Sequence, residues 1–142
     1  MSVALIKRDK YDNPVKAAIE ICNGFGALET DHKVLIKPNL VIGGNKKIMP
    51  PFGKVTTARV VEELIQALVE HGCKDITIGD GAALMPEIGS DTFSAMKFSG
   101  IERIGLKYGV KLEDFESCLL YTSPSPRDQR PNLVFRLRLE KS

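Results

Sequence analysis

The sequence predicts an α/β protein built on a parallel β-sheet with right-handed β-α-β crossovers, incomplete at its C-terminus. Short runs rich in β-branched residues alternate along the chain with stretches of helical periodicity. The central run, Val34–Ile36, is apolar without interruption, so we expect a strand that is covered on both faces. Strands and helices that alternate in this way form parallel sheets joined by right-handed crossovers.

The first expected elements are a strand over residues 2–6 and a helix that begins after Asn13. Asn13 is a favourable N-cap, and Pro14 suits the first helical position. Apolar residues then recur at helical spacing up to Cys22, and Asn23-Gly24 ends the helix. Because Cys22 lies on this apolar stripe, we interpret it as a packing residue rather than a ligand.

The central strand ends abruptly at Pro38, which cannot donate to a sheet ladder. Lys37 and Asn39 therefore lie at the edge of the sheet where open α/β folds bind their ligands. A long Gly- and Pro-rich segment follows, from Gly43 to Gly53. Such a loop is either functional or a mobile surface loop, and the sequence leaves both interpretations open.

The second helix is expected to begin at Thr56-Thr57 and to end at Gly72. We expect its apolar face to consist of Val60, Val61, Leu64, Ile65, Leu68 and Val69. We expect its polar face to consist of Glu62, Glu63, Gln66 and Glu70. His71 lies in the last turn, where we assign it a structural role. We interpret His32 as a solvated loop residue and Cys73 as a packing residue.

The remaining elements complete the predicted β-α-β-α-β-α-β order. A strand over 76–79 ends at Asp80-Gly81, and a loop is expected over 82–90. Phe93, Met96 and Phe98 carry a weak helical signal, a short helix is expected over 101–108, and a strand over 110–115.

Composition favours an ordinary soluble protein. The chain has 142 residues and a net charge of +2, but residues 1–117 alone carry 15 basic and 16 acidic residues. We therefore expect no nucleic-acid partner. No apolar run reaches the roughly 20 residues of a membrane span, and the first ten residues lack a signal-peptide core, so we expect no membrane contact and a cytoplasmic protein. The three cysteines form no C-x-x-C pair, so no metal site is expected.

We interpret the chain as two parts, the N-terminal part of an α/β domain (1–117) and a non-native tail (118–142). The eleven residues from Cys118 to Asp128 match, without a mismatch, the translation of a transposase adapter used in sequencing libraries. The similarity resumes after Pro131 and is broken at Phe135 and Arg138. We expect the natural chain to continue beyond Glu116. The alternative is a natural Pro-rich tail with a Ser-Pro linker or phosphosite.

Polar residues at strand ends and at a helix start predict a ligand site. Lys37 and Asn39 follow the central strand, Thr56 and Thr57 begin a helix, and Asp80 ends the next strand. A helix N-terminus and a lysine suit a phosphate or carboxylate, so we expect a small anionic molecule. A structural explanation stays open for each residue, since a Thr can cap the helix, Lys37 can pair with Asp80, and Asn39 can hold a turn.

Several motifs together resemble the domain of unknown function family 362. They are Val34-Leu-Ile-Lys-Pro-Asn-Leu-Val41, Thr56-Thr57-x-x-Val60-Val61-Glu62, Gly72-Cys-Lys-Asp-Ile-Thr-Ile-Gly-Asp80, Gly100-Ile101 and Lys107-Tyr-Gly-Val-Lys-Leu112. Two positions depart from the family pattern. Ala58 stands where members often continue with His-Pro or Ser-Pro, and the loop after Asp80 lacks the usual Ser-Pro-Gly.

The resemblance implies a redox link, because many members carry a ferredoxin-like cysteine cluster beyond this domain. We expect no cofactor in this fragment and an iron–sulfur cluster in the missing C-terminal part. The alternatives are a non-redox phosphate- or carboxylate-binding domain of transferase type and a structural or assembly domain. Catalytic residues are not identified by the sequence.

Overall fold

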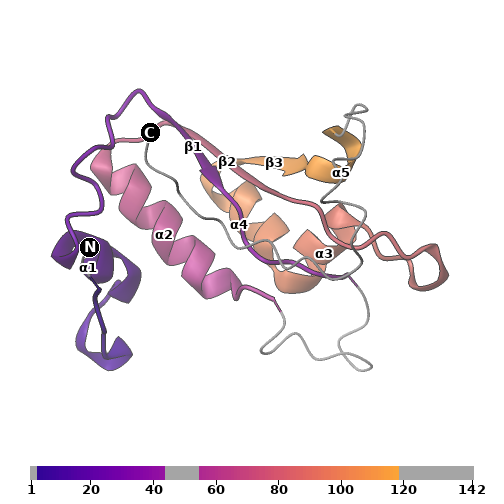
Figure 1. Cartoon of the computed structure of the whole chain (residues 1–142), viewed down its shortest axis with the longest axis horizontal. Coiled ribbons are helices and arrows are strands. Elements are labelled where there is room, and N and C mark those ends of the chain that lie inside the picture. Colours follow the sequence, from indigo (N-terminus) through magenta and orange to yellow (C-terminus); the bar gives the residue numbers. More distant parts are fainter. Residues whose placement is uncertain (1–2, 44–54, 119–142) are drawn as a thin grey trace, which may run out of the picture.

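The computed structural model describes residues 3–43 and 55–118 of the chain, and of Ser117 and Cys118 only the backbone. Most of the Gly- and Pro-rich segment and the tail after Cys118 lie outside the described residues. The elements, in chain order (Figure 1), are η1 (Arg8–Lys10), α1 (Pro14–Ile21), β1 (Lys33–Ile36), α2 (Ala58–His71), β2 (Asp75–Asp80), η2 (Pro86–Ile88), α3 (Thr92–Ser99), α4 (Ile101–Tyr108), β3 (Lys111–Asp114) and α5 (Phe115–Cys118).

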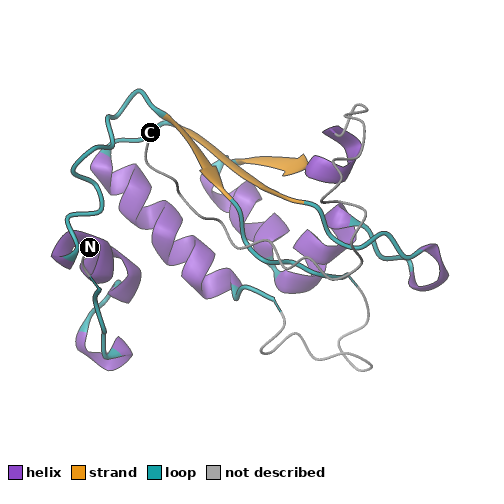
Figure 2. Ribbon diagram, in the orientation of Figure 1, coloured by secondary structure: helices purple, strands orange, loops and turns teal. Residues whose placement is uncertain are grey.

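The three described strands form a parallel sheet in the order β1-β2-β3, which confirms the α/β fold class (Figure 2). Ile36 lies opposite Ile78, and Ile78 lies opposite Leu112. Helix α2 connects β1 to β2, and α3 and α4 connect β2 to β3. Because all three strands run the same way, their carboxyl ends meet at one edge.

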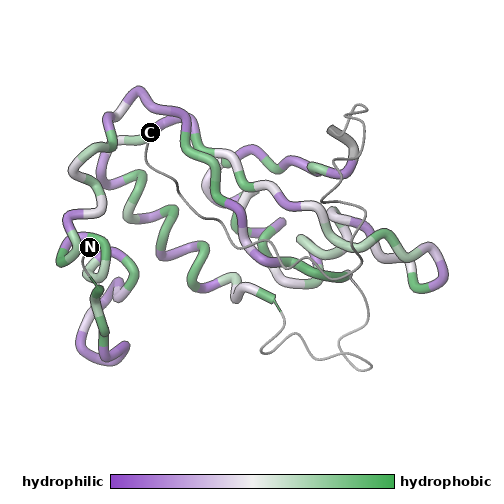
Figure 3. The backbone as a smooth tube through the Cα atoms, in the orientation of Figure 1, coloured by the Kyte–Doolittle hydropathy of each residue, from purple (hydrophilic) through white to green (hydrophobic). Residues whose placement is uncertain are grey.

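The hydrophobic core lies on one face of this sheet. Ile36, Ile76 and Ile78 are buried there with Ile65 and Leu68 of α2. Figure 3 shows hydrophobic residues recurring along β1 and α2, the two elements that contribute to this core.

The expectation that β1 is covered on both faces is wrong for the described part of the chain. Leu35 is 57% exposed, and it lies on the opposite face from Ile36. With Lys33, Asp75, Thr77, Lys111 and Glu113, it lines a shallow depression of about 320 Å³ on the open face. An apolar run does not reveal how many faces are packed, because coverage depends on where the helices lie.

The predicted first strand is also wrong, since residues 3–6 form no strand. Val3 and Leu5 are 86% and 99% exposed. Their apolar sequence favours an extended backbone, but a strand also requires a neighbouring strand to pair with. Among the described residues, no strand pairs with this segment.

The predicted helix ends are confirmed where capping chemistry marks them. The Asn13 side chain accepts a hydrogen bond from the Lys16 amide at 2.8 Å and caps α1. Helix α2 ends at Gly72, which adopts φ 102°, a left-handed conformation that glycine reaches without strain. Helix α4 spans Ile101–Tyr108 as predicted, and Gly109 ends it.

Helix α2 buries the middle of its predicted apolar face in the core, but it is also covered on a second side. Glu63, which we expected on the exposed face, is only 6% exposed, whereas Val69 is 49% exposed. The N-terminal segment packs against this side of α2 and covers Glu63. Arg8 and Arg59 bind its Oε1 atom, at 2.5 and 2.9 Å. The sequence of α2 alone does not reveal that the N-terminal segment packs against it and buries Glu63.

Candidate functional site

Lys37 and Asp80 meet at the carboxyl edge of the sheet. Lys37 follows β1, Asp80 ends β2, and Lys37 Nζ lies 2.5 Å from Asp80 Oδ1. The Asp80 side chain is 4% exposed and the Lys37 side chain 56%. The ion pair that the sequence left as one alternative is therefore present, with its carboxylate buried and its ammonium at the surface.

The second carboxylate oxygen of Asp80 accepts a hydrogen bond from the Leu40 amide at 2.8 Å. Leu40 is fully buried, so this amide has no access to water. Asp80 thus holds the turn after β1 at two points, the Lys37 side chain and the Leu40 backbone. The sequence does not predict this second contact, because a backbone amide carries no residue-specific signal.

Asn39 and Thr56 join the end of the β1 segment to the start of α2. The Asn39 amide donates to Thr56 Oγ1 at 2.8 Å, and the Thr56 amide donates to the Asn39 carbonyl at 2.8 Å. Thr57 follows as the N-cap of α2, but its side chain makes no capping hydrogen bond. Thr57 is therefore confirmed as the N-cap residue. Its hydroxyl, however, does not cap the helix as the structural explanation requires.

Four of the five predicted site residues therefore form two directly bonded pairs, and the fifth lies beside them. Lys37 is paired with Asp80, Asn39 with Thr56, and Thr57 stands at the helix start. The first N–H groups of a helix have no intrahelical acceptor, and the helix dipole is positive at this end. The edge thus combines an exposed ammonium with a helix N-terminus, which is a combination suited to an anion.

A second group of contacts holds the loop beside this edge. Val41 adopts φ 54°, an uncommon conformation for a β-branched residue, and its carbonyl accepts from the Ala83 amide at 2.8 Å. The Gly43 amide donates to Ser90 Oγ at 2.9 Å, and Ser90 Oγ donates to the Ala83 carbonyl at 2.8 Å. Ser90 is 1% exposed. The sequence predicts an ordinary loop position for Ser90 and carries no signal of these contacts.

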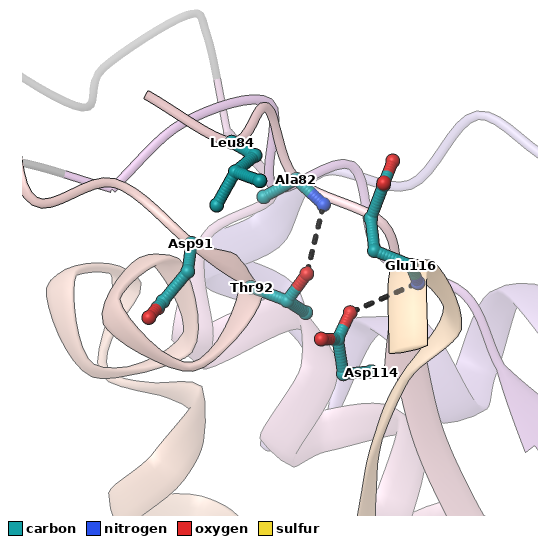
Figure 4. Close-up of a pocket in the computed structure, with 6 residues that line it drawn as sticks. All are labelled: Ala82, Leu84, Asp91, Thr92, Asp114 and Glu116. Carbon is teal, nitrogen blue, oxygen red and sulfur yellow. Dashed lines mark hydrogen bonds between the residues drawn. The ribbon is translucent and has the colours of Figure 1, made fainter. Parts of the chain in front are cut away.

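A cavity of about 250 Å³ lies farther along the same edge, between the ends of β2 and β3 (Figure 4). Its lining comprises Ala82, Leu84, Asp91, Thr92, Asp114 and Glu116. The side chains of Asp91 and Glu116 point away from one another (Figure 4). Three carboxylates line this cavity, so their charge opposes the anionic ligand that the sequence predicts.

The polar groups of this cavity also make contacts within the protein. Thr92 Oγ1 accepts from the Ala82 amide at 3.1 Å, and Asp114 Oδ1 accepts from the Glu116 amide at 3.0 Å. Asp91 caps α3 by accepting from the Ser94 amide at 2.6 Å. The cavity is therefore stabilised from within, and none of its residues was among those predicted from the sequence.

In the described part of the chain, one group of side chains has the spacing of metal ligands, namely Glu29, Asp31 and His32. All three are exposed, which confirms the solvated position expected for His32. His32 Nδ1 accepts a hydrogen bond from the Glu29 amide at 3.2 Å, so this nitrogen has a partner within the loop.

The two cysteines whose side chains are described do not form a metal site. Cys22 follows α1 and is half-buried, and Cys73 follows α2 and is buried in the core. The packing role expected for Cys73 is confirmed. A ferredoxin-like cluster needs four cysteine ligands, so these residues do not fit one.

His71, by contrast, has a clear structural role. Its Nε2 atom lies 2.8 Å from the Leu28 carbonyl, and its ring stacks on Phe25 with centroids 4.6 Å apart. These contacts join the connection before β1 to the end of α2, so the structural role expected for His71 is confirmed.

None of the helices in the described residues is long and apolar enough to cross a membrane. Comparison with curated proteins and with solved structures found no significant match. The model of one family, "Domain of unknown function (DUF362)", matches residues 34–131. This range begins at β1, contains all five predicted site residues, and extends past Cys118 into the segment for which we predict a non-native origin. Because the match covers more than half of the 142 residues, the chain belongs to the DUF362 family.

Proposed function

We propose that this domain binds a small anionic molecule, a phosphate or a carboxylate, at the carboxyl edge of its sheet beside Lys37. The observation that carries the proposal is the position of the Lys37 ammonium, which a buried carboxylate anchors at 2.5 Å while more than half of the side chain stays exposed. An ammonium has three donors, and the contact with Asp80 Oδ1 occupies one of them. Within the described residues, the other two donors meet no acceptor, which leaves them for an oxygen ligand.

The neighbouring residues would have distinct roles in binding. Thr57 would contribute its hydroxyl and the start of α2 its backbone N–H groups, both of which suit anionic oxygens. Asn39 and Thr56 hold the turn against the helix through their mutual hydrogen bonds. Asp80 is a positioning residue here, because its own charge would repel an anion while its two hydrogen bonds hold Lys37 and Leu40 in place.

A purely structural role is the competing explanation, and a specific observation favours it. The predicted site residues satisfy one another through the Lys37–Asp80 and Asn39–Thr56 contacts. On this explanation, the edge is a connector between β1, β2 and α2, and no ligand is required.

Thermal unfolding of the full chain with inorganic phosphate or malonate tests the proposal. The ionic strength is held constant with chloride, since salt also screens charges and kosmotropic anions stabilise proteins in general. We expect a saturable rise in Tm that Lys37→Met abolishes. Lys107→Met is the matched control, because Lys107 is an exposed lysine paired with Glu62 away from this edge. A Tm that does not respond, or responds equally in both variants, would reject the anion site.

We further propose, from the family resemblance, that the domain belongs to a redox or iron–sulfur-linked protein whose cluster lies outside the described residues. Resequencing the gene from its source DNA through and beyond the Glu116 codon tests this proposal and the predicted boundary at 117 together. A downstream C-x-x-C-x-x-C run, with iron and acid-labile sulfide in the purified protein, would support it. A natural continuation without such a run would favour the non-redox binding or transferase-type alternative.

A further inference from the structure

We propose that the extended segment Val3–Ile6 adds as an edge strand to β1 of a second copy of this chain, in a reciprocal exchange that closes a two-fold dimer. The inference is independent of the anion site. It rests on two complementary features of the described residues, an apolar segment that pairs with none of the described strands and an apolar strand that pairs with a described strand on one side alone.

The segment Val3–Ile6 has the properties of a strand except for pairing. Its four residues are apolar, and Val3 and Leu5 are almost fully exposed while Ala4 and Ile6 are half-buried, which is the alternation of a strand with two faces. The following residue, Lys7, has an extended backbone, with φ −78° and ψ 116°. Exposed apolar side chains at successive alternate positions indicate a surface that becomes covered.

The outer edge of β1 fits this segment better than the outer edge of β3. Among the described strands, β1 pairs on one side alone, with β2. Its residues Val34–Ile36 are apolar, and Leu35 is 57% exposed on the open face. Strand β3 carries Lys111 and Glu113, charged residues of the kind that discourage strand addition at an edge. An added strand at β1 would gain main-chain hydrogen bonds and a neighbour for Leu35.

Contacts of the N-terminal region favour a second copy over the segment's own sheet. Arg8 binds Glu63 at 2.5 Å, the Asn13 side chain donates to the Glu63 carbonyl at 2.8 Å, and Lys16 binds Glu70 at 2.5 Å. In Figure 1 the N-terminus lies beside α1, and α2 stands between α1 and the sheet. Exchange between copies keeps these contacts, whereas pairing within one chain would have to break them. Reciprocal exchange also closes, so it yields a dimer rather than a filament.

Analytical ultracentrifugation of the full chain over a wide concentration range tests the inference. We expect a concentration-dependent dimer, and we expect Leu5→Pro to weaken dimerisation by about tenfold or more, because proline removes a main-chain donor from the added strand. Leu35→Lys should weaken it as well. Leu5 is exposed, so folding should be unaffected, and an unchanged circular dichroism spectrum and Tm would verify this.

Ile21→Lys is the matched control, since Ile21 is an exposed apolar residue at the end of α1, outside the segment. It should leave the dimer constant unchanged. A wild-type chain that stays monomeric at all concentrations would overturn the inference, and so would a dimer that Leu5→Pro leaves intact. If Ile21→Lys weakens the dimer as much as Leu5→Pro does, the association is non-specific and hydrophobic, and the inference is overturned too.

Discussion

Replacing Asp80 separates the two tasks that its carboxylate performs at the sheet edge. One oxygen accepts from the exposed Lys37 ammonium, and the other accepts from the Leu40 amide, which has no access to water. Asp80→Ala removes both acceptors. Asp80→Asn keeps one oxygen, which can still accept from the Leu40 amide while Lys37 turns into solvent.

The expected costs follow from burial. The Leu40 amide left without an acceptor costs about 1–3 kcal/mol and loss of the ion pair costs about 0–1 kcal/mol, so we expect Asp80→Ala to lower the free energy of unfolding by about 1–4 kcal/mol in all. The half-exposed ion pair itself is worth about 0–1 kcal/mol, so Asp80→Asn should cost about 1 kcal/mol.

Urea denaturation followed by circular dichroism measures both free energies, with linear extrapolation to water. The m-value should be the same in all three proteins, since a changed m-value would indicate an altered denatured state. If Asp80→Asn destabilises as much as Asp80→Ala, the ion pair dominates and our assignment of the Leu40 amide as the main structural contact is wrong.

Three further predictions concern other parts of the chain. Gly79→Ala should cost about 1–3 kcal/mol through overpacking, because a Cβ atom there would come within 2.4 Å of the Phe115 ring; Phe115→Ala should relieve most of this cost in a double-mutant cycle by denaturation. Hydrogen bonding to the Lys107 ammonium holds the pKa of Glu62 below its ordinary value of 4.5. The stability from this pair is therefore present above pH 4.5 and is lost as the pH falls through the lowered pKa. Lys107→Met should flatten this part of the pH–stability curve, and an unchanged curve would contradict the assignment. Val41→Gly should change the free energy of unfolding by less than about 1 kcal/mol in either direction, because relief of the φ 54° conformation offsets the added freedom of glycine; a loss of several kcal/mol in the same assay would show that Val41 is not strained.

Much of the secondary structure follows from local signals in the sequence. The bounds of α4, the cap of α1 at Asn13 and the left-handed end of α2 at Gly72 were predictable, because capping acts within a few residues of the helix end. The convergence of Lys37 and Asp80 was also predictable, since parallel strands end at the same edge.

Long-range contacts decided the rest. The sequence by itself determined the approximate positions of α1, α2, α4 and the three described strands, and which polar residues follow the strands. Only the tertiary structure decided that Val3–Ile6 pairs with none of the described strands, that Leu35 faces solvent and that Glu63 is buried beneath Arg8. The physical reason is that helix and cap formation depend on residues a few positions apart. Strand pairing and burial depend instead on which distant segment packs alongside, and periodicity in one segment carries no record of its neighbour.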